Sequence, residues 1–250
     1  MKRFIGDLLK YKDYAVYAMK AELKSEVAGS YLNWIWWVLE PFCFMLVYTF
    51  IFGVVFDARE QYFPLFVYLG LIVWEFFSNS VKASVRLVKR NKGTVSKVYI
   101  PKFILIIIEM LIHGFKFLVA CSITVGMMIV FKVPISLNIF YLIPLFIVLI
   151  LLTFGLSCIC MHIGVYIQDM SKIINILFRM LFYLTGVFFS IEHRFGDRYP
   201  VLSGILQDAS PTAFLVTGFR KALIYSESVN VPVMIIWLAI SLCLSVIGVA

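Results

Sequence analysis

The sequence predicts an all-α polytopic membrane protein with six transmembrane helices. Of its 250 residues, 62% are hydrophobic and only 14% are charged, and the mean hydropathy is +0.97. Soluble domains are roughly 45–50% apolar and about 25% charged. A soluble chain of this size cannot bury such an apolar excess in one core, because much of the folded chain remains at the surface. The composition therefore excludes a soluble enzyme, a secreted disulfide scaffold and a disordered chain.

The apolar residues fall in six runs that approach or exceed the length of a helical membrane crossing, about 20 residues. These runs are 34–56, 65–81, 103–131, 139–165, 173–190 and 231–250. The second and fifth are short, and the third is long enough to require tilt. Lipid offers the backbone no hydrogen-bond partners, so each run is expected to be a helix.

Basic residues are distributed unequally between the two ends of these spans. The N-terminal segment and the 82–102 loop are rich in Lys and Arg, and the connections on the opposite side carry few. Basic loops stay on the cytosolic side of a membrane. The sequence therefore predicts a cytosolic N-terminus, and six crossings return the C-terminus to the cytosol.

Residues 1–32 are expected to form a cytosolic amphipathic region before the six-helix transmembrane domain at 33–250. Positions such as Ile5, Val16 and Leu23 share an apolar arc of about 100° on a helix over 3–26. One interpretation is an interfacial helix lying on the cytosolic leaflet. The other is an amphipathic helix packed on protein, and the two are compatible.

The 82–102 loop contains no acidic residue. Its charge has two interpretations: it fixes the topology of the chain, or it forms a short helix that docks on a partner subunit. Pro101 ends the loop because proline cannot continue a helix from the preceding turn. The candidate docking residues are Arg86, Lys89, Arg90, Lys92 and Lys97.

The 191–230 segment between spans five and six is longer than a plain connection. Its apolar stretches, Tyr199–Gln207 and Thr212–Tyr225, are too short to cross a bilayer. Ser210 followed by Pro211 predicts a helix start, with a serine cap and proline in the first turn. The segment is expected to hold external re-entrant or interfacial helices, which are tolerated where protein covers them.

Ionisable residues predicted at or near membrane depth, where charge is costly, are Glu40, Glu75, Glu109, His113, Lys116, Asp169 and Arg179. Glu109, His113 and Lys116 share one face of a helix because they are spaced by four and three positions. They fit either a proton relay or mutual neutralisation within the bundle. Neutralisation is favoured, since no second chain of carboxylates accompanies them.

Aromatic residues make up 17% of the chain. Most are expected to be core or lipid-facing, but some are candidates for a sugar path, because sugar C–H faces stack on rings. The candidates are Trp37, Phe42, Tyr48, Phe182, Tyr183 and Phe188.

No catalytic or metal-binding pattern appears in the sequence. There is no G-x-x-x-x-G-K-[ST] phosphate loop, so the chain is not expected to hydrolyse ATP alone. The three histidines are scattered, and the five cysteines sit in apolar runs as small hydrophobic residues. We therefore expect no catalytic residues, no metal and no cofactor bound by this chain. The net charge of +8 is explained by topology and not by nucleic acid.

Several motifs, taken in order, resemble type-2 ABC exporter permeases of the polysaccharide, O-antigen and teichoic-acid export family. They are Ser30–Pro41, Val47–Gly53, Tyr68–Ser78, Lys97–Lys102, Gln168–Met170 and Ser210–Thr212. The similarity covers nearly the whole chain. The sequence departs from the usual Leu-Gly of the family at Leu32-Asn33, which leaves the substrate subclass open.

The resemblance implies that two copies of the chain pair with two ABC-type ATPase subunits in the bacterial cytoplasmic membrane. ATP and magnesium would then be held by the partner, which would dock on Val85–Ser96. A lipid-linked glycan would pass outward between the permeases along the aromatic residues of spans one and five. The 199–225 segment is similar to the external gate of the family, which carries over to Tyr199, Pro211, Phe214 and Phe219.

Two rival functions remain at this point. A type-2 exporter of drugs or lipids would share the fold. A membrane glycosyltransferase would need a cytosolic or external acidic cluster, and the sequence offers none.

Overall fold

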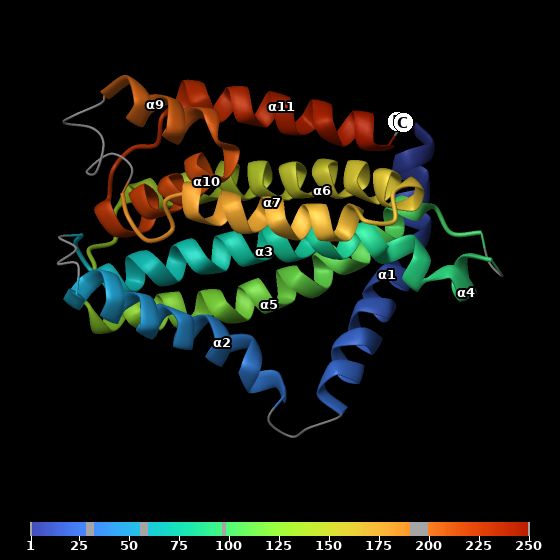
Figure 1. The fold of residues 1–250 in the computed structure, drawn as a ribbon, viewed down its shortest axis with the longest axis horizontal. Helices are drawn as coiled ribbons and strands as arrows, with labels where there is room; N and C mark the ends of the chain where they lie inside the picture. The colour runs from blue at the N-terminus through green and yellow to red at the C-terminus, as the bar shows by residue number, and fades with distance from the viewer. Residues whose placement is uncertain (1, 29–32, 56–59, 97–98, 191–199, 250) are drawn as a thin grey trace.

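The computed structural model describes residues 2–28, 33–55, 60–96, 99–190 and 200–249. Within these ranges the chain is a bundle of helices joined by short turns and contains no strand (Figure 1). The prediction of an all-α polytopic membrane protein is confirmed.

The elements follow the chain in one order, each with defined bounds. They are α1 (Lys2–Ala28), α2 (Asn33–Tyr48), the π-helix η1 (Thr49–Val55), α3 (Phe63–Arg90), α4 (Lys92–Val95), α5 (Lys102–Val130), the 3₁₀-helix η2 (Leu137–Tyr141), α6 (Leu142–Tyr166), α7 (Met170–Leu184), α9 (Pro200–Ala209), α10 (Pro211–Arg220), the π-helix η3 (Lys221–Tyr225) and α11 (Val231–Val249).

Five helical stretches of the described chain are long and apolar enough to cross a membrane. They are Trp34–Val55, Phe63–Arg90, Lys102–Val130, Leu137–Tyr166 and Val231–Val249. Each coincides with one of the predicted spans. The protein is therefore a multi-pass membrane protein.

The predicted fifth span, 173–190, differs from the structure at its C-terminal end. Helix α7 has 15 residues and ends at Leu184, and Thr185–Ser190 form a turn instead of a further helical segment. At 1.5 Å per residue such a helix covers roughly 22 Å, less than the bilayer core of about 30 Å. A sixth complete crossing stays a prediction.

The second span continues further than its hydropathy indicates. Helix α3 runs to Arg90, so residues 82–90 of the expected loop are helical. Val85 and Leu87 keep their side chains buried, while Arg86, Lys89 and Arg90 lie on the exposed side. A hydropathy window averages over both faces and so misses an amphipathic helix end.

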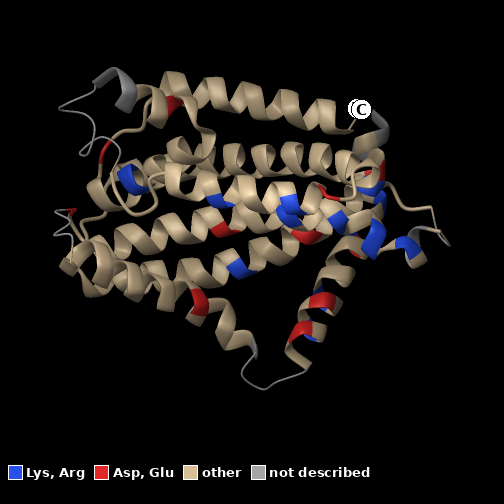
Figure 2. Ribbon diagram, viewed as in Figure 1, with Lys and Arg blue, Asp and Glu red and all other residues tan. Residues whose placement is uncertain are grey.

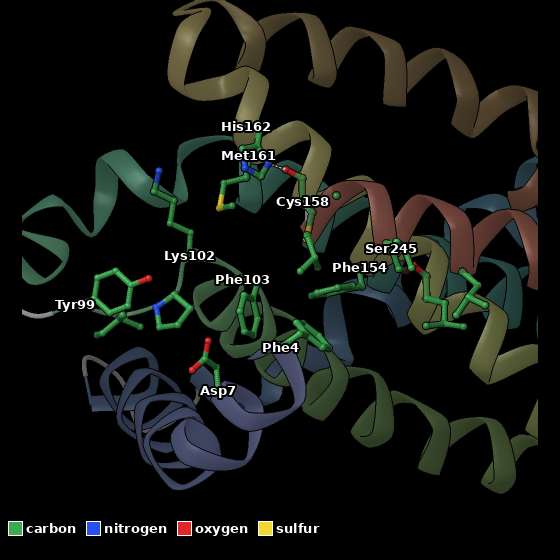
Figure 3. Close-up of a pocket in the computed structure, with 17 residues that line it drawn as sticks. Phe4, Asp7, Tyr99, Lys102, Phe103, Phe154, Cys158, Met161, His162 and Ser245 are labelled. Atoms are coloured by element: carbon green, nitrogen blue, oxygen red, sulfur yellow. Dashed lines mark hydrogen bonds between the residues drawn. The ribbon is translucent and has the colours of Figure 1, made fainter. Parts of the chain in front are cut away.

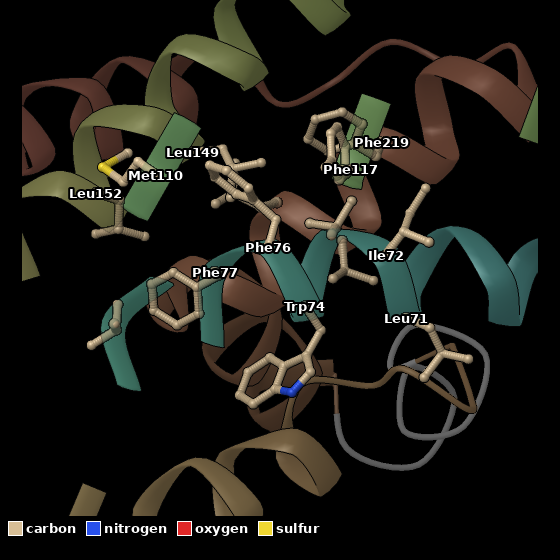
Figure 4. Close-up of a cluster of buried hydrophobic side chains, with 14 of the residues drawn as sticks. Leu71, Ile72, Trp74, Phe76, Phe77, Met110, Phe117, Leu149, Leu152 and Phe219 are labelled. Atoms are coloured by element: carbon tan, nitrogen blue, oxygen red, sulfur yellow. The ribbon is translucent and has the colours of Figure 1, made fainter. Parts of the chain in front are cut away.

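Helix α3 forms the centre of the bundle. It packs against α2, α5, α6, α7 and α10, and most of its side chains are buried. Figure 4 shows Ile72, Phe76 and Phe77 of α3 among Phe117, Leu149 and Phe219 from the surrounding helices.

Helices α6 and α11 pack more closely than larger side chains would allow, because each helix presents a glycine to the other. A Cβ on Gly155 would lie 2.8 Å from the backbone of Leu244, and one on Gly248 would lie 2.6 Å from Cβ of Cys158. The Ser245 hydroxyl donates to the Leu151 carbonyl at 2.9 Å and joins the two helices.

The connections gather at the two ends of the bundle. The first turns of α1, the α4 region, the α6–α7 turn and the last turn of α11 lie at one end, and α9, α10 and η2 lie at the other (Figure 1). Basic residues concentrate at the first end (Figure 2). This grouping agrees with the predicted sidedness, although the orientation itself remains a prediction.

Candidate functional site

The candidate docking residues lie at the basic end of the bundle. Arg86, Lys89 and Arg90 are on the last turns of α3, and Lys92 is on α4. Lys97 lies outside the described residues. The arginines and Lys89 line a cavity of about 340 Å³ that also contacts the α6–α7 turn through Gln168. Three cations on the end of α3 and one on α4 therefore form a basic surface, and a surface of one charge attracts groups of the opposite charge.

Gly164 allows α6 and α3 to approach closely beneath this basic cavity. A Cβ on Gly164 of α6 would collide with the backbone carbonyl oxygen of Val85 on α3. The two helices therefore touch directly below the basic side chains, which gives those side chains a rigid base.

Arg90 has a partner inside the protein. Its guanidinium pairs with the carboxylate of Glu109 on α5, whose side chain is 7% exposed against 53% for Arg90. Of the candidate docking residues, Arg86, Lys89 and Lys92 are exposed. The described part of the chain contains no ion-pair partner for these three.

The polar residues on one face of α5 bind neighbouring helices and not chiefly one another. His113 lies 3.9 Å from Glu109 through Nε2, but Lys116 pairs with Glu26 of α1 at 2.7 Å. Lys116 also lies 5.3 Å from the ring centre of Trp37. The charges of Glu109 and Lys116 are therefore neutralised chiefly by partners in α3 and α1, which spacing along the chain cannot reveal, and less by one another.

Glu40 lines a small cavity of about 140 Å³ with His113 and Lys116. Glu75 of α3, also predicted at membrane depth, lines this cavity, and so does Asn79, which was not predicted. Pro41 lies inside α2 without ending it.

Four of the six candidate path aromatics meet around Phe188. Its ring centre lies 4.0 Å from that of Tyr48, 5.0 Å from Phe182 and 6.3 Å from Tyr183. Phe188 is 2% exposed, whereas Tyr183 is 59% exposed, so the cluster runs from the core to the surface.

The structure adds two rings to this cluster and gives Trp37 a different ring partner. Phe52 stacks on Phe188 at 5.2 Å, and Trp74 lies 5.6 Å from Phe182. Trp37 instead meets Phe115 edge-on at 6.1 Å. Phe42 is only partly buried and packs against the core.

Helix α10, in the 191–230 segment, begins as predicted after Ser210. The serine hydroxyl accepts the Ala213 backbone N–H, and Pro211 opens α10. Helix α10 is buried against α3 and α6, with Phe214 and Phe219 only 3% and 1% exposed. Tyr199 lies outside the described residues. The candidate gate residues Phe214 and Phe219 therefore belong to the core of the subunit.

Arg220, at the end of α10, is a site residue that sequence reasoning missed. It is 2% exposed, and its guanidinium donates to the carbonyl oxygens of Phe66, Gly186 and Val187 at 3.1, 2.8 and 2.6 Å. It also lies 3.4 Å from the ring centre of Phe66. Gly186 and Val187 follow the C-terminus of α7, where carbonyl groups lack helical partners and carry partial negative charge.

A second polar contact joins η3 to the α2–α3 connection. The Tyr225 hydroxyl donates to Glu60 at 2.9 Å. Burial, together with the neighbouring Glu60 carboxylate, raises the pKa of the Tyr225 phenol. The phenol therefore remains a hydrogen-bond donor at neutral pH.

Curated relatives resemble the chain over most of its length. An O-antigen export system permease protein, RfbA of Klebsiella pneumoniae, is 24% identical over 99% of this chain and 93% of its own. RfbA of Myxococcus xanthus is 27% identical over 77% of this chain and 74% of its own. The polysialic acid transport protein KpsM of Escherichia coli is 24% identical over 68% of this chain and 67% of its own.

The family comparison agrees with the fold and with these relatives. The ABC-2 type transporter family matches residues 16–224, which include α2 to α10 and the C-terminal half of α1. The five long apolar helices and the absence of strands in the described residues fit a membrane-embedded transporter subunit. The chain belongs to the ABC-2 type transporter family and is a permease of that type.

Proposed function

We propose that this chain is the membrane subunit of an ATP-driven exporter of a cell-surface glycan. The observation that carries the proposal is the similarity to an O-antigen export permease over 99% of this chain and 93% of that relative. A polysialic acid transport protein is a further relative. Export of a drug or a lipid is the less favoured function, because these relatives are named for glycans.

The finer proposal concerns substrate and location. The glycan is carried on a polyprenyl phosphate or pyrophosphate and crosses the bacterial cytoplasmic membrane, with both ends of the chain in the cytosol. The basic end of the bundle supports this orientation. The aromatic cluster around Phe188 supplies ring faces for sugars, and its surface end at Tyr183 supports a path along α7 and α2.

A separate ATPase supplies the energy in this proposal. The chain has no phosphate loop, so ATP and its magnesium ion would be bound by two copies of a partner. Arg86, Lys89 and Lys92 form the docking surface, because they are exposed on α3 and α4. ATP binding would shift the populations of inward-open and outward-open states.

A second copy of the chain completes the exporter. Helices α2 and α7 expose apolar side chains such as Phe44, Val47, Ile176 and Met180. Apolar residues of this kind face either lipid or another membrane helix. We assign these faces to the contact between two permeases, with the glycan path between them.

Transport is tested by reconstituting the chain with a candidate ABC-type ATPase subunit into liposomes. ATP hydrolysis should rise when the lipid-linked glycan is added, and labelled glycan should move into sealed vesicles. A hydrolysis-deficient ATPase is the control. Stimulation by a drug but not by the glycan, or stimulation without this chain, contradicts the proposal.

Docking is tested with the pair Arg86→Glu and Lys89→Glu, leaving Arg90 in place because it pairs with Glu109. The ATPase should no longer co-purify. Lys10→Glu with Lys20→Glu is the matched control, since both residues are exposed basic positions on α1. Full retention of the ATPase by the α3 variant rejects the docking surface.

A further inference from the structure

A cavity of about 900 Å³ lies at the predicted cytosolic end of the bundle, between α1, α5, α6 and α11 (Figure 3). Ligand cavities in proteins span roughly 300–1,000 Å³. This cavity takes no part in the proposed docking surface or in the aromatic cluster around Phe188. Its walls come from the interfacial helix and from three membrane spans.

The cavity is preformed, because the helices around it are already in contact elsewhere. Gly248 and Ser245 hold α11 directly against α6, so α11 cannot move further onto that helix. Phe4 of α1 lies 4.6 Å from the ring centre of Phe103 and 6.2 Å from that of Phe154. These rings fix α1 against α5 and α6 and leave the space beside them open.

The lining is polar at one side and apolar at the other. Figure 3 shows Asp7 and Lys102 near Tyr99 at one side, with Phe154 and Ser245 at the other. Leu242 and Val246 of α11 extend the apolar part. An apolar cavity does not hold water well, so this part favours a hydrocarbon chain.

The polar side offers one positive and one negative group. Among the residues that the structure describes, neither Asp7 nor Lys102 has a hydrogen-bond or ion-pair partner. His162 contacts the carbonyl oxygen of Cys158 through Nδ1 at 2.9 Å. A carbonyl only accepts, so Nδ1 carries the hydrogen and Nε2 stays available for a ligand.

We propose that this cavity binds one membrane phospholipid whose headgroup carries both a phosphate and a primary ammonium. Lys102 contacts the phosphate, Asp7 accepts from the ammonium, and an acyl chain fills the apolar part beside Phe154 and Leu242. The cavity lies where a lipid of the cytosolic leaflet has its boundary between headgroup and hydrocarbon, because α5 starts and α11 ends there. A purely anionic headgroup would be repelled by Asp7.

Native mass spectrometry of the detergent-purified full chain tests this proposal. The protein is titrated with phosphatidylethanolamine, phosphatidylcholine and phosphatidylglycerol of identical acyl chains. One phosphatidylethanolamine should be retained about three- to fivefold more strongly than either of the others, as expected for one partly exposed charged contact.

Charge variants identify the headgroup contacts. Lys102→Gln and Asp7→Asn should each weaken phosphatidylethanolamine retention about threefold or more. Lys12→Gln and Asp13→Asn are matched controls, because both residues are exposed on α1 and do not line the cavity. Equal elution volume and thermal unfolding of all variants confirms that each one folds.

A larger side chain in the apolar part of the cavity tests where the acyl chain binds. Leu242→Trp should abolish selective retention, whereas Ile247→Trp, at an exposed position of α11 outside the cavity, should not. Equal retention of all three lipids overturns the proposal, and so does retention that survives Leu242→Trp. Stronger retention after Asp7→Asn also overturns it, and identifies an anionic lipid such as a polyprenyl phosphate as the occupant.

Discussion

At the scale of single residues, Arg220 is the most informative side chain of the described structure. Its charge is buried, and it is bonded to three carbonyl groups from two separate parts of the chain. Two of those carbonyls belong to the turn that ends α7 and the third to α3. One guanidinium therefore joins α10, α7 and α3, and its planar fork suits several acceptors at once.

Replacement of Arg220 is expected to destabilise this junction. Arg220→Met leaves three buried carbonyls without their donor and should lower the free energy of unfolding by about 2–4 kcal/mol. Arg220→Lys should recover only part of this loss, because a single ammonium cannot reach all three acceptors. Unfolding in mixed detergent micelles measures the difference, and an unchanged Arg220→Met variant contradicts the assignment.

Gly70 belongs to the same junction. A Cβ at this position would collide with Nη2 of Arg220, so Gly70→Ala should be destabilising. Gly126→Ala is the control, since nothing lies within 4 Å of a Cβ there, and alanine should stabilise the helix by about 0.5–1 kcal/mol. In the Arg220→Met background, Gly70→Ala should lower the free energy of unfolding by less, because the guanidinium with which the Cβ collides is gone.

At the scale of elements, the contacts between helices cannot be read from the sequence of each helix alone. Specific contacts hold the end of the bundle that contains α10: Arg220 holds the C-terminus of α7, the Ser210 cap holds α10, and the bond from Tyr225 to Glu60 holds η3. The α6–α11 pair is held mainly by close backbone approach.

Gly155 should be essential for the α6–α11 contact. A Cβ would lie 2.8 Å from backbone atoms of Leu244 and Ser245, and backbone cannot move aside as a side-chain tip can. Gly155→Ala should therefore cost about 1–3 kcal/mol of stability. Gly114→Ala, whose Cβ would be 3.7 Å from Phe76, should be neutral or better in the same unfolding measurement. Equal behaviour of the two variants would show that α11 is free to shift.

At the scale of the whole molecule, the arrangement predicts which connections share a side of the membrane. Ser96, next to α4, and Ser228, between η3 and α11, are exposed at opposite ends of the bundle. In a background without the native cysteines, Ser228→Cys should react with an impermeant maleimide on intact cells. Ser96→Cys should react only after the membrane is opened, and labelling of both from one side would reject the topology.

The sequence by itself determined the class of the molecule and the position of five long helices. Lipid demands continuous apolar helices, so the composition of each segment reveals a span without knowledge of its neighbours. The helix start at Ser210 was also predictable from the sequence, because a serine cap is a local contact that reaches only three residues along the chain.

Only the tertiary structure decided where α7 ends, that Phe214 and Phe219 lie in the core, and which partners neutralise Glu109 and Lys116. These partners, Arg90 and Glu26, lie on other helices, and no local spacing indicates which helices meet. In the sequence, Arg220 has no feature that distinguishes it from any other basic residue of a connecting segment. It becomes a structural centre because the fold brings three carbonyl groups to it, and the pairing of helices, not their composition, determines that contact.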